Sequence, residues 1–241
     1  MKRIAAVMVF VMFCFSAVYA KDPGRLFGNF FGGYATVSMS DLNEEINQAY
    51  DTGVLFPDRS KQNAENGYIV GADIGLIPWG GLMIMLRGEY IGGLEGSYKS
   101  DPDGDYLDVS MKPVLIPIMA GVKYEIDVPT TAFFISAGVF GGYGIANVET
   151  KISFLGVEAE NEFTGGGLVA EIAGEFGLRT SESVSFAINV LYRMANIEEV
   201  KAVKSAMGYD EGQVLENGGT GNPIEMDFSG LTLGGSMLFR F

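Results

Sequence analysis

The sequence predicts an all-β fold in which eight antiparallel strands close into an up-and-down barrel. Three observations carry this prediction: apolar residues alternate with small or polar ones along eight segments, the strand number is even, and short connections alternate with long ones. The 241 residues, 48% of them hydrophobic, are enough for a single domain of this kind, and no second domain is visible.

The alternation defines the strands. In the last segment, "LTLGGSMLFRF", every second residue from Leu231 to Phe241 is apolar or glycine, and the residues between are mostly small or polar. A period of two is typical of strands whose two faces meet different surroundings. The expected strands cover 25–39, 68–78, 82–92, 114–126, 132–146, 168–179, 184–195 and 231–241.

The connections alternate in length along the chain. The short ones are 78–81, 127–130 and 180–183, and the long ones cover about 41–66, 97–110, 147–166 and 197–226. Tight turns at one end and long loops at the other are typical of a barrel in the bacterial outer membrane, with the short turns in the periplasm. The first long loop starts with a Ser and is expected to form a short helix over the barrel mouth.

The first twenty residues, "MKRIAAVMVFVMFCFSAVYA", are expected to be a secretory signal. They combine a basic start, an apolar run and a small-residue site after which cleavage at Ala20 is expected. The barrel domain then covers 21–241, and the exported chain has no cysteine because Cys14 is removed. The fold must therefore hold together without disulfides.

The aromatic residues test the membrane interpretation, because transmembrane barrels gather them at both interfaces. On the outward faces the tyrosines lie about eight to twelve residues from the short-turn end, which matches an apolar band roughly 25 Å tall. A soluble sandwich or lipocalin-type barrel would instead point its apolar face inward. The expected aromatic girdles comprise Tyr34, Tyr68, Tyr90, Tyr143 and Tyr192 at one level and Trp79, Tyr124, Phe133, Phe239 and Phe241 at the other.

The terminal segment "FSGLTLGGSMLFRF" and hairpins such as "GEFGLRTSESVSFAINVLYR" combine the alternating pattern with tight turns. In these segments the chain resembles the small outer-membrane β-barrel proteins of the OmpA, OmpX and OmpW type. The resemblance covers nearly the whole mature chain and implies an outer-membrane location in a Gram-negative cell envelope. It also implies that the barrel-insertion machinery reads the terminal stripe, which faces lipid: Leu231, Leu233, Met237, Phe239 and Phe241.

Enzyme chemistry is not expected. The chain has no His, so a Ser-His or Asp-His mechanism is excluded. Thiol chemistry is also excluded once Cys14 is removed with the signal. Glu171 and Glu175 share a strand face but lie roughly 13 Å apart, beyond the usual spacing of paired glycosidase carboxylates. No cofactor is expected. The net charge of −14 also argues against nucleic acid as a partner.

The inward faces carry equal numbers of acidic and basic residues, which should pair in a lumen of low dielectric constant. The short turns set the register, so Asp73 should face Arg87, Glu171 should face Arg193 and Glu175 should face Asn189. An eight-stranded barrel has little interior space, which favours a polar plug over a selectivity path for solutes. The expected interior ion pairs involve Asp73, Arg87, Glu89, Lys123, Glu125, Glu171, Glu175, Arg179, Arg193 and Arg240.

The long loops are acidic. Asp101, Asp103 and Asp105 are spaced like the start of a calcium loop, but the later glycine and glutamate of that motif are missing, so a solvated acidic turn is favoured. Divalent cations that bridge the loops to lipopolysaccharide are one hypothesis, and cationic ligands or a host surface are another.

Three functions remain open at this point. The first is a monomeric structural or interaction protein that supports envelope integrity and presents acidic loops. The second is a narrow, porin-like channel for small or apolar solutes of the OmpW type, for which inward Phe134, Phe140, Met83, Met85 and Met119 are suited. The third is a soluble periplasmic lipid binder.

Overall fold

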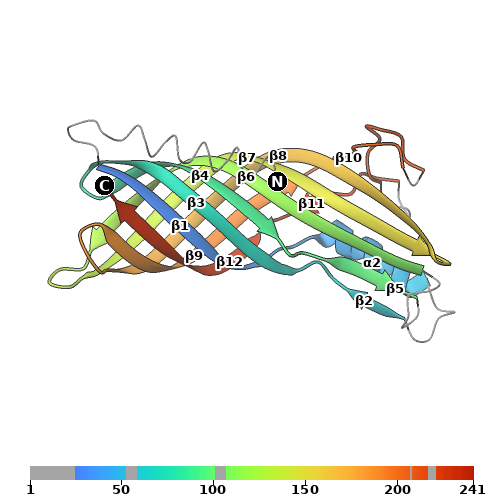
Figure 1. Ribbon diagram of the computed structural model, residues 1–241, viewed down its shortest axis with the longest axis horizontal. Coiled ribbons are helices and arrows are strands. Elements are labelled where there is room, and N and C mark those ends of the chain that lie inside the picture. Colours follow the sequence, from blue (N-terminus) through green and yellow to red (C-terminus); the bar gives the residue numbers. More distant parts are fainter. Residues whose placement is uncertain (1–24, 53–58, 101–106, 207, 217–220) are drawn as a thin grey trace.

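The computed structural model describes residues 25–52, 59–100, 107–206, 208–216 and 221–241. Eight long strands form a closed antiparallel ring in which each strand pairs with its neighbours in sequence and β12 returns to pair with β1 (Figure 1). The predicted fold class is therefore confirmed. The ring consists of β1 (Arg25–Thr36), β3 (Asn66–Trp79), β4 (Leu82–Gly92), β6 (Leu107–Asp127), β7 (Phe133–Phe154), β8 (Val157–Arg179), β9 (Val184–Ile197) and β12 (Gly230–Arg240).

The ring closes along a seam between β1 and β12 that has almost no side chains at its centre. Gly32 stands opposite Gly235, and Gly33 stands opposite Gly234. A Cβ atom on Gly33 would lie 2.5 Å from the carbonyl oxygen of Leu233, so the close approach of the two strands needs glycine.

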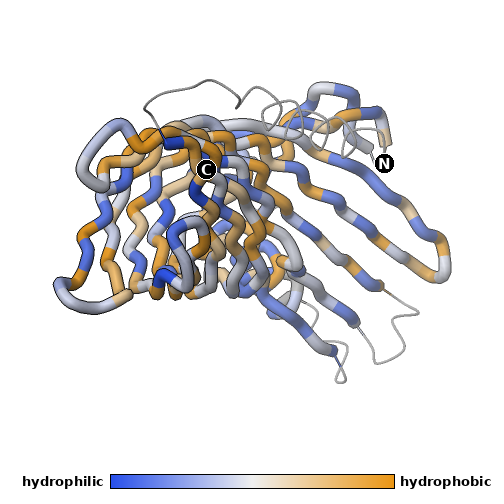
Figure 2. Tube along the Cα trace, turned by 60° about the vertical axis from the view of Figure 1, so that its left-hand side comes forward, coloured by the Kyte–Doolittle hydropathy of each residue, from blue (hydrophilic) through white to orange (hydrophobic). Residues whose placement is uncertain are grey.

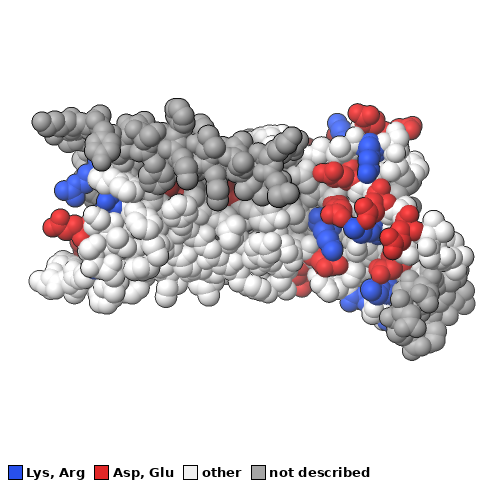
Figure 3. Space-filling view, in the orientation of Figure 1, with Lys and Arg blue, Asp and Glu red and all other residues white. Residues whose placement is uncertain are grey.

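Side chains alternate between the interior and the outside along the ring strands. Figure 2 shows the accompanying alternation of hydrophilic and hydrophobic residues along the chain trace. The outward positions form a wide apolar belt around the barrel, while charged residues on the face in Figure 3 gather at the two ends. The belt includes Phe30, Val70, Leu86, Ile118, Val139, Ile172, Ile188 and Leu233, all exposed. None of the described helices is long and apolar enough to cross a membrane.

Three neighbouring strands extend well past the others at the long-loop end. The β7–β8 hairpin pairs without interruption from Phe133 opposite Leu178 to Phe154 opposite Val157, and β6 pairs with β7 up to Leu107. We call the part of this hairpin from Asn147 to Thr164 the extension. The prediction of a long loop over 147–166 is thus wrong, because the only turn there is Leu155–Gly156.

The other predicted loops also contain regular structure. The expected helix is present as α2 (Ser40–Thr52), and three short strands contact it: β2 (Ser60–Gln62), β5 (Gly96–Lys99) and β11 (Met226–Asp227). A fourth short strand, β10 (Val200–Ala202), pairs with β8. The segment 97–110 is correspondingly not one loop, since β5 and β6 occupy most of its described part. Figure 1 shows α2 near β2, β5 and β11 at the long-loop end, and β10 apart from it beside β8.

These connecting segments, together with α2 and the short strands, form a cap whose apolar side chains are buried in a hydrophobic core. Backbone N–H groups join its parts: Met39 donates to the carbonyl of Asp227 at 2.9 Å, and Ala64 donates to Asn43 Oδ1 at 2.8 Å. The core continues down to the apolar residues that line the upper barrel. Its buried side chains include Met39, Leu42, Ile46, Ala64, Tyr98, Leu215, Ile224, Met226 and Phe228.

Candidate functional site: the charged interior and the outer rim

The barrel interior holds a group of charged residues and one amide that we call the Arg87 cluster: Asn29, Asp73, Arg87, Glu89, Glu171 and Arg193. Asp73 stands opposite Arg87, and Glu171 stands opposite Arg193, which are the partners that the short turns predict. Arg87 Nε donates to Asp73 Oδ1 at 2.7 Å, and its Nη1 donates to Glu171. Glu171 also accepts from Arg193 Nη2 at 3.0 Å, so this carboxylate links the two guanidinium groups.

The cluster contains more acid than base. Arg193 Nη2 also donates to Glu89 Oε2 at 2.7 Å, while Arg87 lies 3.7 Å from the other oxygen of Glu89. Three carboxylates thus surround two guanidinium groups, and every one of these side chains is at most 2% exposed. Charges so far from water are stable only when each has a partner.

Two aromatic rings complete the surroundings of Arg87. Its guanidinium carbon lies 3.8 Å from the ring centre of Phe140 and 4.6 Å from that of Phe31. Contact with aromatic faces stabilises a cation that has left water. Sequence reasoning placed Phe140 inside but missed Phe31 and Asn29, whose Nδ2 donates to Asp73 at 2.9 Å. The alternation along β1 could have identified both residues, since Asn29 and Phe31 lie on its inward face.

A second group of charges lies nearer the short turns. Lys123 Nζ donates to Glu175 Oε2 at 2.9 Å, and Ser136 Oγ donates to the same oxygen at 2.8 Å. Arg240 Nη2 donates to Glu125 at 2.7 Å, and Arg179 also donates to Glu125. Glu175 stands opposite Asn189 in register, as expected.

Arg179 differs from the other predicted interior residues because its side chain is 34% exposed and pairs at 2.5 Å with Asp127 at the barrel end. The other nine predicted ion-pair residues are at most 9% exposed. An interior filled by paired charges and an exterior of apolar side chains are the reverse of a soluble lipid-binding barrel. The lipocalin-like alternative is therefore wrong.

The predicted girdle residues all lie on the outside of the ring. The tyrosine girdle on the long-loop side, which we call the upper tyrosines, has four members that are about half exposed: Tyr34, Tyr68, Tyr143 and Tyr192. Tyr68 stacks on the fifth member, Tyr90, with ring centres 6.1 Å apart. Near the short turns, Trp79, Tyr124 and Phe133 are exposed as well. Phe239 is partly exposed, and its ring lies 6.4 Å from that of Phe30 on the neighbouring strand.

The terminal strand presents its predicted stripe outward. Leu231, Leu233, Met237 and Phe241 are exposed, and the side chains that alternate with them in β12 include buried Thr232 and Leu238. The N–H of Phe241 donates to the carbonyl of Leu26 at 2.9 Å, so the backbone pairing between the first and last strands continues to the final residue.

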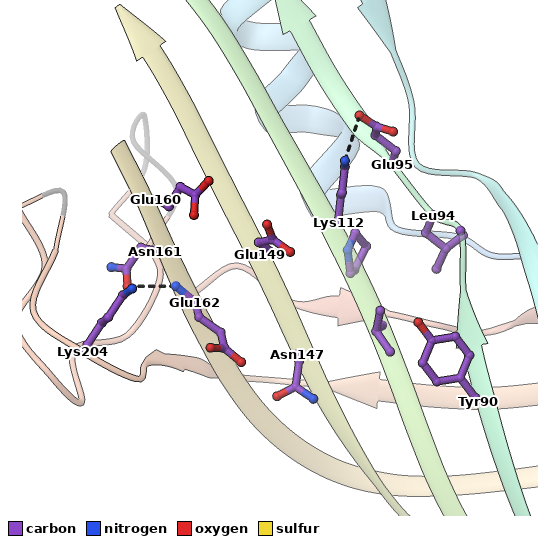
Figure 4. Close-up of a pocket in the computed structure, with 13 residues that line it drawn as sticks. Tyr90, Leu94, Glu95, Lys112, Asn147, Glu149, Glu160, Asn161, Glu162 and Lys204 are labelled. Atoms are coloured by element: carbon purple, nitrogen blue, oxygen red, sulfur yellow. Dashed lines mark hydrogen bonds and ion pairs between the residues drawn. The ribbon is translucent and has the colours of Figure 1, made fainter. Parts of the chain in front are cut away.

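A cavity of about 600 Å³ lies on the outer side of the barrel above the upper tyrosines (Figure 4). Lys112 reaches Glu95 at 3.9 Å across it, and Glu149 and Glu162 line it from the extension. Close by, Lys151 pairs with Glu160 at 2.5 Å and with Glu149 at 3.3 Å. Hydrogen bonding to Glu160 raises the pKa of Lys151 and lowers the pKa of Glu160.

Within the described ranges, no group of three acidic, His or Cys residues is arranged to hold a metal ion. The weak calcium candidate Asp101, Asp103 and Asp105 lies outside those ranges, in 101–106. Residues 1–24 also lie outside them, so the signal and its cleavage after Ala20 stay predictions.

Comparison with solved structures finds small outer-membrane proteins. Neisserial surface protein A is 9% identical, with coverage of 91% of this chain and 100% of that chain and a TM-score of 0.41. Ail, the attachment invasion locus protein of Yersinia pestis, is 11% identical over 89% and 98%, with a TM-score of 0.39. OprG from Pseudomonas aeruginosa is 14% identical over 89% and 95%, with a TM-score of 0.40.

No protein-family model and no curated protein matches the chain. Similarity at this level concerns the course of the backbone and leaves the function open. The chain's own closed ring of eight strands, outward apolar belt and inward charges are what a transmembrane β-barrel requires. The chain has the architecture of the small outer-membrane β-barrel proteins, as the resemblance in its sequence implied.

Proposed function

We propose that this chain is a monomeric, integral outer-membrane protein whose barrel is a closed anchor and whose cap and extension act at the cell surface. The observation that carries the proposal is the combination of an outward apolar belt with an interior filled by paired charges. A belt of this size is stable only against lipid, and a filled interior leaves the long-loop end as the place for function.

The dimensions of the belt support the membrane location. On the outer face of β7, Phe133 lies near the short turns and Tyr143 lies at the upper tyrosine level. Ten residues of strand span roughly 33 Å, and a tilt of about 40° reduces this to about 25 Å of height. That height equals the apolar band of known outer-membrane barrels, with aromatic residues at both edges.

The interior supports an anchor more than a channel. Met83, Met85, Met119, Phe134 and Phe140 all point inward and are at most 4% exposed. Phe140 packs on Arg87, so apolar and charged side chains share one packed interior. The cap core lies above this interior at the long-loop end, so a solute would have to displace both layers.

The partners follow from this location. We infer that the belt contacts outer-membrane lipid and that the cap lies among lipopolysaccharide headgroups, where divalent cations can bridge the acidic surface. The terminal stripe from Leu231 to Phe241 would engage the barrel-insertion machinery after removal of the leader. No nucleic-acid partner and no enzymatic reaction are proposed.

The experiment that tests the proposal combines location with conductance. The full-length protein is expected in the outer-membrane fraction with a gel mobility that changes on boiling, because folded outer-membrane barrels resist SDS. Trp79 is the only tryptophan of the chain, and its side chain is exposed near the short turns. Its fluorescence should be quenched more by lipids labelled near the headgroup than by lipids labelled at the bilayer centre.

Purified protein should then give no discrete openings in planar bilayers. Discrete openings would refute the closed anchor and support the channel alternative. A soluble periplasmic protein without a mobility change would overturn the membrane location itself.

A further inference from the structure

The end of the extension carries large apolar side chains in an unusual place. Leu155 is 62% exposed and Val157 is 71% exposed, next to half-exposed Phe154. We call these residues the tip. From Tyr143 at the upper tyrosine level to Phe154 there are eleven residues of strand, which corresponds to roughly 36 Å along the strand. The tip therefore lies well outside the apolar belt, where lipid does not explain its exposure.

The backbone of the turn provides a second, independent observation. Leu155 has a φ of +50° and Gly156 a φ of +76°, the left-handed conformation of a two-residue hairpin turn. This turn favours Asn-Gly, because the leucine side chain is strained at positive φ whereas asparagine tolerates it. An apolar side chain therefore occupies the outermost point of the extension although the backbone conformation there is strained for leucine.

The support beneath the tip is rigid. The strands of the extension pair residue by residue with no bulge, and β6 pairs along its other edge. Strands held in continuous register present the end of a hairpin in one orientation, which lowers the entropy lost on binding. The tip is therefore suited to be an anchor for another molecule.

The charges around the tip indicate which kind of molecule fits. The charged outward residues of the extension itself are Glu149, Lys151, Glu158, Glu160 and Glu162, which is one base against four acids. Lys112 and Lys204 approach the lower part of this face from neighbouring segments. Lys151 already pairs with Glu149 and Glu160, so Glu158 adds negative charge directly beside the tip. An acidic rim disfavours an anionic bilayer, and it disfavours a second copy of this chain, which would bring the same charges.

We propose that the tip docks into an apolar pocket of a partner protein whose rim carries Lys and Arg residues. An apolar anchor surrounded by complementary charges is the arrangement of a protein interface with a small energetic centre. This inference rests on the proposed surface location, because the extension must face the outside of the cell to meet such a partner.

The test uses the full-length protein in lipid nanodiscs and two displayed libraries of cyclic peptides. Both libraries have an apolar centre; one carries Lys and Arg flanks, and the other carries Asp and Glu flanks. The basic library is expected to yield binders that 0.5 M NaCl weakens. Leu155→Asn and Val157→Thr should each weaken them at least tenfold, and Glu158→Lys should weaken them as well.

The variants separate binding from folding. Leu155→Asn suits the turn better than leucine does, so its resistance to urea should be equal or higher while binding is lost. Val203→Thr is the matched control, because Val203 is exposed outside the extension; it should leave binding unchanged.

Binders that come only from the acidic library, or that are indifferent to Leu155→Asn, would overturn the proposal. So would flotation with phosphatidylcholine vesicles that depends on Leu155, because the tip would then be a membrane contact. If the protein is a closed outer-membrane barrel but no tip-dependent binder exists, only this inference fails and the proposed function stands.

Discussion

Replacing Arg193 with methionine tests whether the paired interior holds the barrel together. Arg193 is 1% exposed and donates to both Glu89 and Glu171. Without it, the three carboxylates of the Arg87 cluster share a single guanidinium. Arg87 lies 3.7 Å from Glu89, which is too far for a hydrogen bond, so Glu89 loses its main partner. Loss of one partner from a buried ion pair costs about 3–5 kcal/mol, or two to four orders of magnitude in the folding equilibrium.

The assay is a urea titration of the protein folded in lipid vesicles, followed through the fluorescence of Trp79. Lys151→Met is the matched control, because Lys151 also joins two carboxylates but does so at the exposed surface. Exposed ion pairs contribute little, so this variant should unfold at nearly the wild-type urea concentration.

The excess of carboxylates over guanidinium groups in the Arg87 cluster leads to a further expectation for the same experiment. Adding Glu171→Gln to Arg193→Met removes one of the carboxylates left in excess, so the double variant should be more stable than Arg193→Met alone. The reasoning is refuted if Arg193→Met loses no more stability than Lys151→Met. It is also refuted if the double variant is the least stable of the series.

Two further substitutions test the packing. Gly177→Ala should cost about 1–3 kcal/mol in the same titration, because its Cβ would lie 2.2 Å from the Phe134 ring; Gly174→Ala, which has open space, should be neutral, and equal effects would contradict the packing. Ile46→Ala should destabilise the cap by about 2–5 kcal/mol, because Ile46 is 3% exposed in its core. Trypsin cleavage in the cap should then become faster, while the change of gel mobility on boiling persists because the barrel stays folded. Loss of that mobility change without faster cleavage would contradict the expectation that the cap can loosen while the barrel stays intact.

The eight membrane strands could be predicted because lipid outside and charge inside impose one pattern on all of them. The extension was missed because that pattern reverses above the membrane. At Val148 and Phe163 the apolar side chains point inward to the cap core, and at Glu149 and Glu162 charged side chains point out to water. A search for strands with apolar outer faces cannot find strands that leave the lipid.

The candidate site was predictable to a similar degree. The short turns fixed which interior residues face each other across neighbouring strands, such as Asp73 and Arg87. The contacts across the barrel were not predictable, because Arg87 reaches Glu171 and Arg193 reaches Glu89 through the lumen rather than along a hairpin. Those contacts depend on the curvature of the closed ring, which no local pattern in the sequence encodes.

The glycine seam between β1 and β12 has a consequence for assembly. All other ring pairings join strands that follow one another in the sequence, whereas Phe30 stands opposite Met237. Loop closure over such a separation is slow compared with hairpin formation, so this pairing forms last. At the centre of the seam no side chains must interlock, and the final step there is a zipping of bare backbone. Closure of the ring inside the bilayer therefore meets no side-chain obstacle at the centre of the seam, and the contacts across the barrel interior can form as the two strands come together.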